Sequence, residues 1–505
     1  MTLAIIYSRA SVGINAPLVT VEAHLSVGLP GFYIVGLPET AVKESKDRVR
    51  SAIINSGFDF PNRRIVINLA PADFPKEGGR FDLPIALGIL TASGQIKNST
   101  ISNYEFVGEL ALSGELRPIA GILPIALATR AARRRLFVPE INAPEAILPQ
   151  DNKVFAATTL QQVYQHLNEQ QIMAPYKNTL EQSPQIAQVS YNDLSDIKGQ
   201  PHAKRALEIA AAGRHNLLLI GPPGTGKTML ATRLPGIMPE LSNDAALEVA
   251  VINSIAVKNS LRTSSWRQRP FRAPHHTASA VAIVGGGSMP RPGEISLSHQ
   301  GVLFLDELPE FDRKVLEVLR EPLESGSITI SRAARQVEFP AQFQLIAAMN
   351  PCPCGYFGDP RGKCKCTSEQ VQRYRSKLSG PLIDRLDMHI EVAALPIKTL
   401  SKSQDSAENS AVVRERVTKT TAIQYQRAGK LNAELSNVEV DKYCALELDT
   451  RKLLHAALEK FGLSARSYHR ILRVSRTIAD LANEQDIKTH HVTEALTLRC
   501  FDRVY

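Results

Sequence analysis

The stretch NLLLIGPPGTGKTML constrains this chain more than any other part of it. The apolar run Asn216 to Ile220 predicts a buried strand, and a G-x-x-x-x-G-K-[ST] loop follows it at the start of a helix. That loop consists of Gly221, Pro222, Pro223, Gly224, Thr225, Gly226, Lys227 and Thr228. Glycines let backbone N–H groups surround phosphate oxygens, and a helix N-terminus favours negative charge. We expect Lys227 to neutralise phosphate oxygens and Thr228 to coordinate Mg²⁺, which predicts a nucleoside-triphosphate site.

A second apolar run, GVLFLDELPEF, predicts another buried strand from Val302 to Leu305. It carries Asp306 and Glu307 to its carboxyl end, where open α/β sheets bind ligands. Asp306 is expected to hold the Mg²⁺, directly or through water, and Glu307 to polarise the attacking water as a general base. An Asp-Glu pair after an apolar run is often only a solvated strand end. The functional interpretation depends on the presence of the phosphate loop in the same chain.

A third run, FQLIAAMN, predicts a strand that ends at Asn350. A neutral amide beside the terminal phosphate can orient the lytic water without adding charge. A hydrogen-bonded loop asparagine is the alternative, and spacing alone leaves both open.

The 505-residue length predicts about two to four domains, with 44% apolar and 22% charged residues as in soluble globular proteins. No apolar run approaches the roughly 18 residues that a membrane span requires, and the start of the chain is a poor secretory signal. We therefore expect a cytoplasmic protein without a membrane partner and with reduced thiols. The net charge of +9 permits a polyanionic partner, although a merely basic surface has the same charge.

The apolar patterning divides the chain into four parts. Residues 1–168 alternate strand-like and helix-like runs, and residues 169–190 form a polar linker. Residues 191–400 predict a parallel sheet flanked by helices, and residues 415–505 predict an all-helical subdomain.

Four of the six cysteines fall in one short segment as C-x-C, nine residues and C-x-C. Cys352, Cys354, Cys364 and Cys366 would suit tetrahedral Zn²⁺, although most zinc sites space their cysteines more widely. Four reduced thiols in a loop are the alternative. We expect structural zinc that stiffens the segment leaving Asn350. Cys444 and Cys500 are interpreted as core residues, and the adjacent pair His275 and His276 as structural rather than metal-binding.

Together these motifs resemble those of AAA+ ATPases. SDIKGQPHAKRALEIAAAGRHN is similar to the opening segment of that family, which implies that Ile197 and Gly199 lie beside the adenine. LSGPLIDRLDMHIEV resembles the segment that presents an arginine finger, here Arg385, to a neighbouring subunit. LSARSYHRILRVSRT resembles the helix with a second sensing arginine, here Arg466.

A narrower resemblance, to the ComM (YifB) group of the magnesium-chelatase-like branch, rests on RPFRAPHHTASAVAIVGGGSMPRPGEISLSHQGVLFLDELPEF and extends over nearly the whole chain. It implies an insert in helix 2 around Val281 to Ser298 and a hairpin before the sensor strand in SITISRAARQVEF. Relatives point such loops into the channel of a hexamer. Arg332 and Arg335 near the hairpin tip would then contact DNA phosphates, unless they belong to an ordinary solvated turn.

The first domain resembles the Lon-protease fold used without proteolysis. In DFPKEGGRFDLPIALG the position of the nucleophilic serine falls on Arg80, and in GELALSGELRPIAGILPIA the position of the lysine falls on Leu123. Because neither partner of the dyad is present, we expect no peptidase activity.

The predicted architecture is therefore α/β, with a Lon-like α+β N-terminal domain, an AAA+ parallel-sheet core and a C-terminal helical lid. The resemblance implies an ATP- and Mg²⁺-dependent homohexameric ring that moves along single-stranded or branched DNA. It also implies helicase activity with branch migration, which helps to integrate DNA during natural transformation. A protein-remodelling or metal-chelatase motor is the alternative. A nucleotide-gated scaffold is disfavoured because Asp306 and Glu307 are intact.

Overall fold

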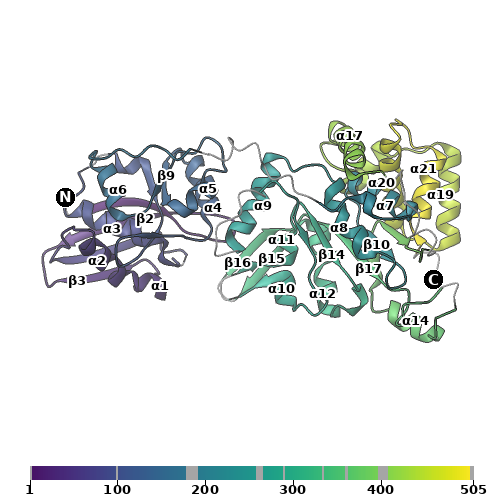
Figure 1. Cartoon of the computed structure of the whole chain (residues 1–505), viewed down its shortest axis with the longest axis horizontal. Coiled ribbons are helices and arrows are strands. Elements are labelled where there is room, and N and C mark those ends of the chain that lie inside the picture. The colour runs from purple at the N-terminus through teal and green to yellow at the C-terminus, as the bar shows by residue number, and fades with distance from the viewer. Residues whose placement is uncertain are drawn as a thin grey trace. The chain divides into compact units, whose positions relative to one another are not determined.

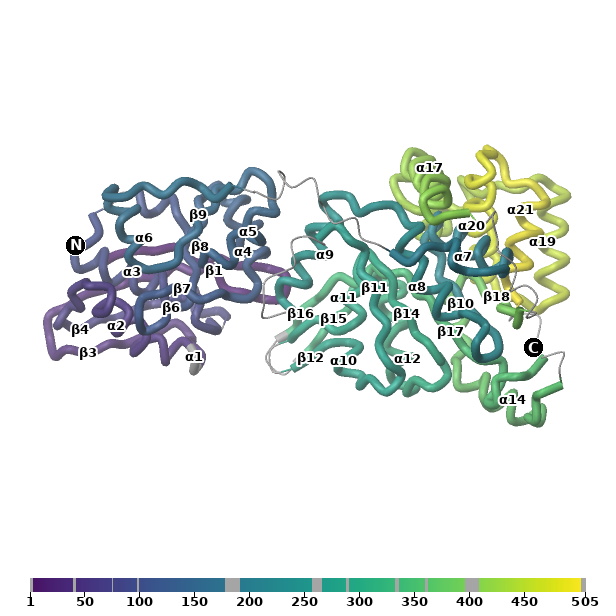
Figure 2. Tube along the Cα trace, viewed as in Figure 1, coloured from purple at the N-terminus to yellow at the C-terminus, as the bar shows by residue number. Residues whose placement is uncertain are grey.

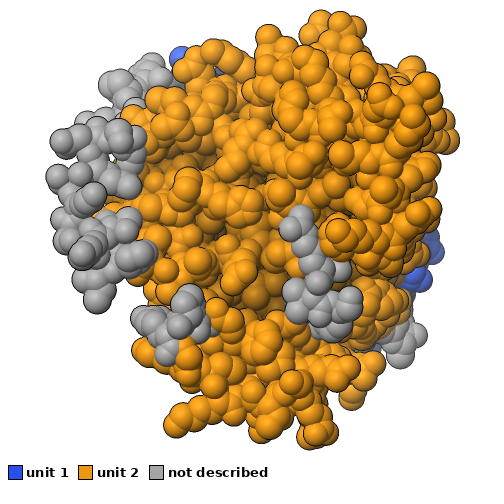
Figure 3. All heavy atoms as spheres, turned by 90° about the vertical axis from the view of Figure 1, so that its right-hand side faces the viewer, with its two compact units in different colours: residues 1–188, 243–266, 333–339 blue, residues 189–242, 267–332, 340–505 orange. Residues whose placement is uncertain are grey.

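The computed structural model describes residues 3–74, 76–97, 100–177, 191–256, 266–287, 290–332, 335–358, 362–395 and 408–500. The chain divides into two compact units, which Figure 3 colours separately. The first contains residues 1–188, 243–266 and 333–339. The second contains residues 189–242, 267–332 and 340–505, so the chain passes between the units several times.

The first unit is built on a mixed seven-stranded sheet (Figure 1). Strands β1, β2 and β4 pair antiparallel, and the other neighbours pair parallel. Buried and more exposed residues alternate along β2, as expected where one face of a sheet covers a core. The strand order is β3 (Gly31–Val35), β4 (Arg64–Ala70), β2 (Leu18–Ser26), β1 (Leu3–Arg9), β5 (Tyr104–Phe106), β8 (Arg135–Pro139), β9 (Val154–Ala157).

Helices and a small sheet complete the first unit. The apolar helix α3 (Asp82–Ala92) is buried almost throughout against β1 and β2. Helix α9 (Asn243–Ala256), which follows the phosphate loop in the sequence, packs in this unit against α4 (Ile122–Ala131). The remaining elements are α1 (Thr40–Lys43), α2 (Ser45–Asn55), the 3₁₀ turn η1 (Gly79–Phe81), β6 (Glu109–Leu110), β7 (Leu116–Arg117), α5 (Ala143–Ala146) and α6 (Leu160–Leu167).

The second unit contains a five-stranded parallel sheet. Its central strands are continuous buried apolar runs, because helices cover both faces of a parallel sheet. The order is β11 (Phe271–Arg272), β14 (Val302–Leu305), β17 (Gln344–Met349), β10 (Leu217–Ile220), β18 (Met388–Glu391).

The helices around this sheet are short, apart from the two that flank β10. They are α7 (Pro201–Gly213), α8 (Lys227–Ile237), α12 (Arg313–Val318), α13 (Pro322–Ser325), α14 (Ser368–Arg375) and α15 (Gly380–Ile383). Residues 280–287 and 290–297 form a helix, a two-stranded ribbon and a second helix: α10 (Ala280–Val284), β12 (Gly285–Gly286), β13 (Arg291–Pro292) and α11 (Glu294–Leu297). Strands β15 (Ser327–Arg332) and β16 (Arg335–Pro340) form another two-stranded sheet.

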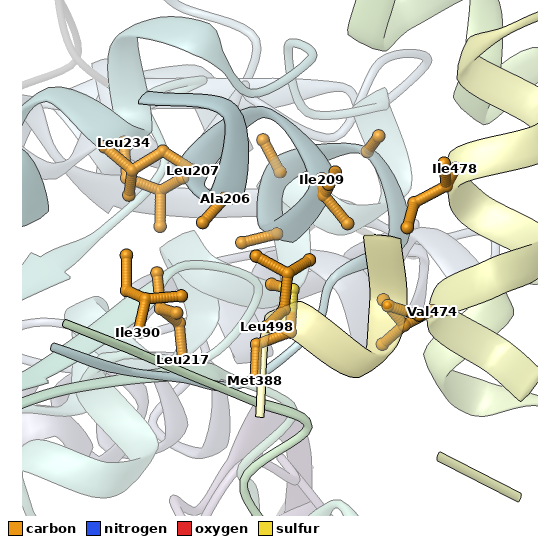
Figure 4. Close-up of a cluster of buried hydrophobic side chains, with 14 of the residues drawn as sticks. Ala206, Leu207, Ile209, Leu217, Leu234, Met388, Ile390, Val474, Ile478 and Leu498 are labelled. Atoms are coloured by element: carbon orange, nitrogen blue, oxygen red, sulfur yellow. The ribbon is translucent and has the colours of Figure 1, made fainter. Parts of the chain in front are cut away.

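The C-terminal part is helical and shares one core with the sheet. Its helices, green to yellow in Figure 2, are α17 (Ser410–Ala428), α18 (Asn437–Tyr443), α19 (Leu448–Phe461), α20 (Ala465–Leu481) and α21 (Thr489–Thr497). Figure 4 shows Val474 and Ile478 of α20 beside Ile209 of α7 in the cluster that also holds strand residues. The helical C-terminal part is thus joined to the five-stranded sheet by apolar packing.

These features confirm the predicted fold class: a mixed α/β N-terminal part, a central parallel sheet and a helical C-terminal part. Within the described residues, none of the helices has the length and apolar character that would let it cross a membrane.

Candidate nucleotide-binding site

Three neighbouring strands bring the sequence-predicted residues to one edge of the sheet. Ile220 of β10 pairs with Met349 of β17, and Leu305 of β14 pairs with Ala347 of β17. The strands are parallel, so the residues that follow them lie together. Gly221, Asp306 and Asn350 therefore begin the three segments of the site.

The phosphate loop joins β10 to α8 through left-handed backbone conformations. Gly224 and Gly226 have φ of 76° and 88°, values that residues with a Cβ rarely adopt. Thr225 Oγ1 donates to the carbonyl of Pro222 at 2.9 Å and closes the loop on itself. Helix α8 begins at Lys227, so its free N–H groups face the loop.

The Lys227 ammonium lies inside this loop. Its Nζ donates to the carbonyls of Gly221 at 2.7 Å and Pro222 at 3.0 Å, and to Asn350 Oδ1 at 3.2 Å. Burial lowers the pKa of Lys227, against the attraction of Asp306 and Glu307. A phosphate would offer this poorly solvated ammonium charged acceptors in place of neutral ones.

Thr228 and Asp306 meet across the loop. Thr228 Oγ1 donates to Asp306 Oδ2 at 2.7 Å. A hydroxyl oxygen and a carboxylate oxygen are the hard ligands that Mg²⁺ prefers alongside phosphate oxygens and water. The pair thus fits the predicted Mg²⁺ ligands in both chemistry and proximity.

Glu307 has an unusual backbone and an unforeseen neighbour. It has a φ of 53°, and its N–H donates to Asp306 Oδ1 at 2.9 Å. Its Oε2 lies 3.3 Å from Nδ1 of His276, which follows β11, the strand next to β14. The sequence analysis gave His276 a structural role and missed this contact with the proposed base.

The predicted adenine-side residues precede α7. Ile197 is buried in the core that the sheet shares with the lid, and Gly199 has a φ of 61°. Gln200 Nε2 donates to the carbonyl of Ala393, just beyond β18, at 2.6 Å. These contacts attach the opening segment to the sheet beside the phosphate loop.

Arg385 lies at the end of α15 and is largely buried. Its guanidinium forms an ion pair with Glu324 of α13 and donates to the carbonyl of Pro381 at 2.6 Å. Burial lowers the pKa of Arg385, and Glu324 acts against that shift. The predicted finger is thus held by its own chain in this conformation.

Arg466 is exposed in the first turn of α20. One turn later, Arg470 donates to the carbonyl of Arg385 at 3.1 Å and forms an ion pair with the buried Asp387. Burial alone would raise the pKa of Asp387, but Arg470 and His215 hold it well below its usual range. This ion pair joins the lid to the end of the sheet.

The predicted DNA contacts lie partly outside the described residues. Arg332 ends β15 and Arg335 begins β16, but their side chains are not among those described.

The four clustered cysteines converge. Cys352 Sγ lies 3.3 Å from Cys354 Sγ and 3.8 Å from Cys364 Sγ, and the last two sulfurs are 3.7 Å apart. All four sulfurs lie within 4.8 Å of one another. Tetrahedral Zn²⁺ with Zn–S bonds of about 2.3 Å separates its sulfurs by about 3.8 Å, so these positions fit one ion.

Backbone N–H groups point at these sulfurs. That of Phe357 donates to Cys352 Sγ at 3.3 Å, and those of Lys365 and Tyr356 lower the pKa of Cys354 to about 6. These hydrogen bonds favour the thiolate of Cys354, the form that binds metal. At Cys364 and Cys366 a backbone hydrogen bond also lowers the pKa, but the neighbouring thiols and burial outweigh it and raise the pKa of both.

The two positions that the Lon resemblance aligns with a protease dyad are Arg80 and Leu123. Arg80 donates to the carbonyl of Ala120 at 3.4 Å, and burial lowers its pKa to about 10. Leu123 is buried in a cluster with Leu148, Ala250 and Val251, so part of its cover comes from α9. These two positions therefore hold no nucleophile and no amine base.

Three protein-family models match successive parts of the chain. Residues 193–400 match the family model described as magnesium chelatase, subunit ChlI. Residues 21–142 match that of subunit ChlI of Mg-chelatase, and residues 407–499 match the ChlI C-terminal model.

Several relatives align with the chain over its full length. Competence protein ComM of Haemophilus influenzae is 54% identical over 505 residues, which cover 100% of this chain and 99% of that protein. The uncharacterized protein YifB of Escherichia coli is 49% identical over 504 residues, covering 100% and 98%. DNA replication licensing factor mcm6 of Schizosaccharomyces pombe is 23% identical over 319 residues, covering 60% of this chain and 32% of that protein. The chain therefore belongs to the ComM family of magnesium-chelatase-like AAA+ proteins.

Proposed function

We propose that this protein is a Mg²⁺-dependent ATPase. The observation that carries the proposal is the meeting of Lys227, the Thr228–Asp306 pair and Asn350 at the end of three parallel strands. Lys227 would neutralise the terminal phosphates, and the Thr228–Asp306 pair would hold Mg²⁺, which supplies the charge that phosphoryl transfer requires. Glu307 would take the proton of a water oriented by Asn350, and Ile197 and Gly199 would lie beside the adenine.

Lys227→Ala tests the nucleotide site. The variant should lose binding of a fluorescent ATP analogue and all ATP hydrolysis, because the phosphate loop loses its buried ammonium. The control is Lys452→Ala, at a lysine whose side chain is 77% exposed in the lid. Retained hydrolysis in Lys227→Ala would overturn the assignment.

We further propose that ATP hydrolysis drives movement along DNA, with helicase and branch-migration activity that promotes integration of DNA during natural transformation. The full-length likeness to a competence protein supports this role, as does the partial likeness to a DNA replication factor. The net charge of +9 suits a polyanionic partner. Arg332 and Arg335, at adjoining ends of β15 and β16, are the proposed phosphate contacts.

Unwinding of forked and four-way DNA measures this activity directly. With ATP, the full-length protein should unwind the fork and move the branch point of the four-way junction. Arg332→Ala together with Arg335→Ala should weaken DNA binding at every sequence.

The three matches to magnesium-chelatase subunit models favour a second candidate, a motor for protein remodelling or metal insertion. That function predicts ATP hydrolysis that branched DNA does not stimulate.

The working form is proposed to be a homohexameric ring in which Arg385 of one subunit reaches the ATP of the next. Arg385→Ala should keep nucleotide binding and lose hydrolysis, because the finger acts only on charge that develops during transfer. Light scattering with ATP and forked DNA measures the mass. A monomer that hydrolyses ATP at full rate would refute the ring.

We propose that one zinc ion is bound by Cys352, Cys354, Cys364 and Cys366. The spacing of their sulfurs and the N–H groups that donate to them suit one tetrahedral ion. Elemental analysis of the purified protein should find one zinc per chain.

A further inference from the structure

The segment that carries the cysteines touches the phosphate loop. We name residues 351–358 and 362–366 the cysteine loop, which begins directly after Asn350. At Gly355 an added Cβ would lie 2.8 Å from Pro223 Cδ and 3.8 Å from Asn350 Cγ. The Gly355 backbone is therefore packed against Pro223, with no room for a side chain between them.

A metal ligand holds the turn that makes this contact. Cys352 is fully buried, and its carbonyl accepts from the N–H of Gly355 at 2.9 Å. Its sulfur accepts from the N–H of Phe357. One cysteine thus fixes both sides of Gly355 through its carbonyl and its sulfur.

The C-terminal end of the cysteine loop leads into α14, whose last residue contacts the start of the loop beside Asn350. Thr367 follows the last cysteine and caps α14, accepting from the N–H of Gln370 at 3.3 Å. At the other end of α14, Arg375 Nε donates to the carbonyl of Pro351 at 3.3 Å, and its guanidinium lies 5.4 Å from the centre of the Phe357 ring. The segment therefore closes on itself beside Asn350.

We propose that the cysteine loop braces the phosphate loop, so that zinc binding by the cysteines sets the affinity for ATP. The inference rests on the proposed zinc and ATP sites and links them. With the metal bound, the first cysteine pair is tied to the second, and Gly355 stays against Pro223. Without it, the two cysteine pairs are no longer tied together, the turn held by Cys352 loosens, and Pro223 loses the surface that keeps the phosphate loop in place.

Two glycines allow a matched test of the contact. Gly355 and Gly358 have φ of 83° and 80°, so alanine meets the same backbone strain at both. Among the residues that the structure describes, none has an atom within 4 Å of a Cβ at Gly358, whereas Pro223 blocks a Cβ at Gly355. Binding of a fluorescent ATP analogue and zinc content are measured for both full-length variants.

Gly355→Ala should weaken nucleotide binding at least about fivefold, while Gly358→Ala stays within about twofold of the native protein and both keep one zinc per chain. Equal affinity in the two variants would overturn the brace, because strain alone would then account for any change. Loss of zinc from Gly355→Ala with native affinity for the ATP analogue would likewise overturn the brace.

The metal itself is tested at the exposed ligand. Cys354→Ser should lose zinc and bind the ATP analogue at least about fivefold more weakly, whereas Cys500→Ser, outside the cluster, should match the native protein. Chelated native protein should regain its affinity when Zn²⁺ is returned under reducing conditions. Unchanged affinity after verified zinc loss would refute the brace and leave both sites standing. ATP hydrolysis by Lys227→Ala would refute the nucleotide site instead.

Discussion

At the scale of single residues, the contact between His276 and Glu307 adds most to what the motifs indicate. Glu307 is the proposed general base, and such a base must point at its water. Its side chain is 52% exposed, so it needs a neighbour to orient it. His276 is that neighbour at 3.3 Å, and its ring also meets the Phe311 ring edge-on. We interpret His276 as a positioning residue for the base.

His276→Ala should lower kcat for ATP roughly tenfold and leave KM nearly unchanged, because nucleotide contacts remain while the base loses its orientation. His276→Gln, which keeps a donor, should recover part of the rate. Steady-state kinetics measure both variants.

The neighbouring His275 is the control for this prediction. Its ring is hydrogen-bonded to Thr277 Oγ1 at 2.9 Å and lies against the His276 ring, with centroids 4.1 Å apart, so His275→Ala should lower kcat much less than His276→Ala does. A larger loss in His275→Ala than in His276→Ala would contradict the positioning role.

At the scale of elements, helices α13 and α20 both contact Arg385. Glu324 of α13 takes its guanidinium, and Arg470 of α20 donates to its carbonyl. Helix α13 is followed directly by β15, the first strand of the proposed DNA-contacting hairpin. The ion pair to Glu324 therefore ties the proposed finger to the base of that hairpin.

Glu324→Ala should raise the ATP hydrolysis rate about two- to fivefold, because an ion pair with one exposed partner is worth at most about 1 kcal/mol and its loss frees Arg385. Arg385→Ala in the same background should remove hydrolysis. A slower Glu324→Ala enzyme would mean that the pair positions the finger rather than restrains it.

Arg470→Ala should destabilise the second unit by about 3 kcal/mol, because Asp387 would remain buried without its cation. The pKa of Asp387 is depressed, so this contribution is present at neutral pH and is lost only as pH falls below the ordinary aspartate range, about 4. Urea unfolding at pH 7 measures it.

Arg466→Ala, exposed on the same helix, is the matched control. It should leave the unfolding midpoint unchanged, although its proposed sensing role predicts slower ATP hydrolysis. Equal destabilisation by the two variants would reject the Asp387 explanation.

The sequence could predict the strand ends of the site but not all of their neighbours. The phosphate loop, Asp306 and Asn350 each follow a continuous apolar run, so their place at the carboxyl edge follows from parallel pairing. His276 follows only the two-residue strand β11, and its approach to Glu307 depends on strand order, which no local pattern encodes. The partner of Arg385 lies 61 residues away in sequence and was likewise beyond reach.

At the scale of the whole molecule, the assignment of α9 to the first unit is the main departure from sequence order. Gly121 and Leu123 both donate backbone N–H groups to Ser254, at 3.0 and 3.4 Å, and Val251 lies in the same apolar cluster as Leu123. Helix propensity predicts the helix, but nothing local tells which core it joins.

Val251→Asp should destabilise the first unit by at least about 3 kcal/mol, because a carboxylate would be buried among apolar side chains. Nucleotide binding, which uses the second unit, should persist. Hydrogen exchange of α4 and binding of an ATP analogue measure the two effects.

The comparison variant is Glu248→Gln, at an exposed position of the same helix. It should protect α4 as the native protein does. Loss of nucleotide binding in Val251→Asp without added exchange in α4 would contradict the assignment of α9.

The placement of α9 also bears on how such proteins can be dissected or recombined. A cut at the polar linker would place α9 on the C-terminal fragment and separate it from α4, against which it packs. Neither fragment would then fold by itself or could be moved as a unit into another protein. Chimaeras between relatives should tolerate exchange only when residues 243–266 travel with the amino-terminal fragment.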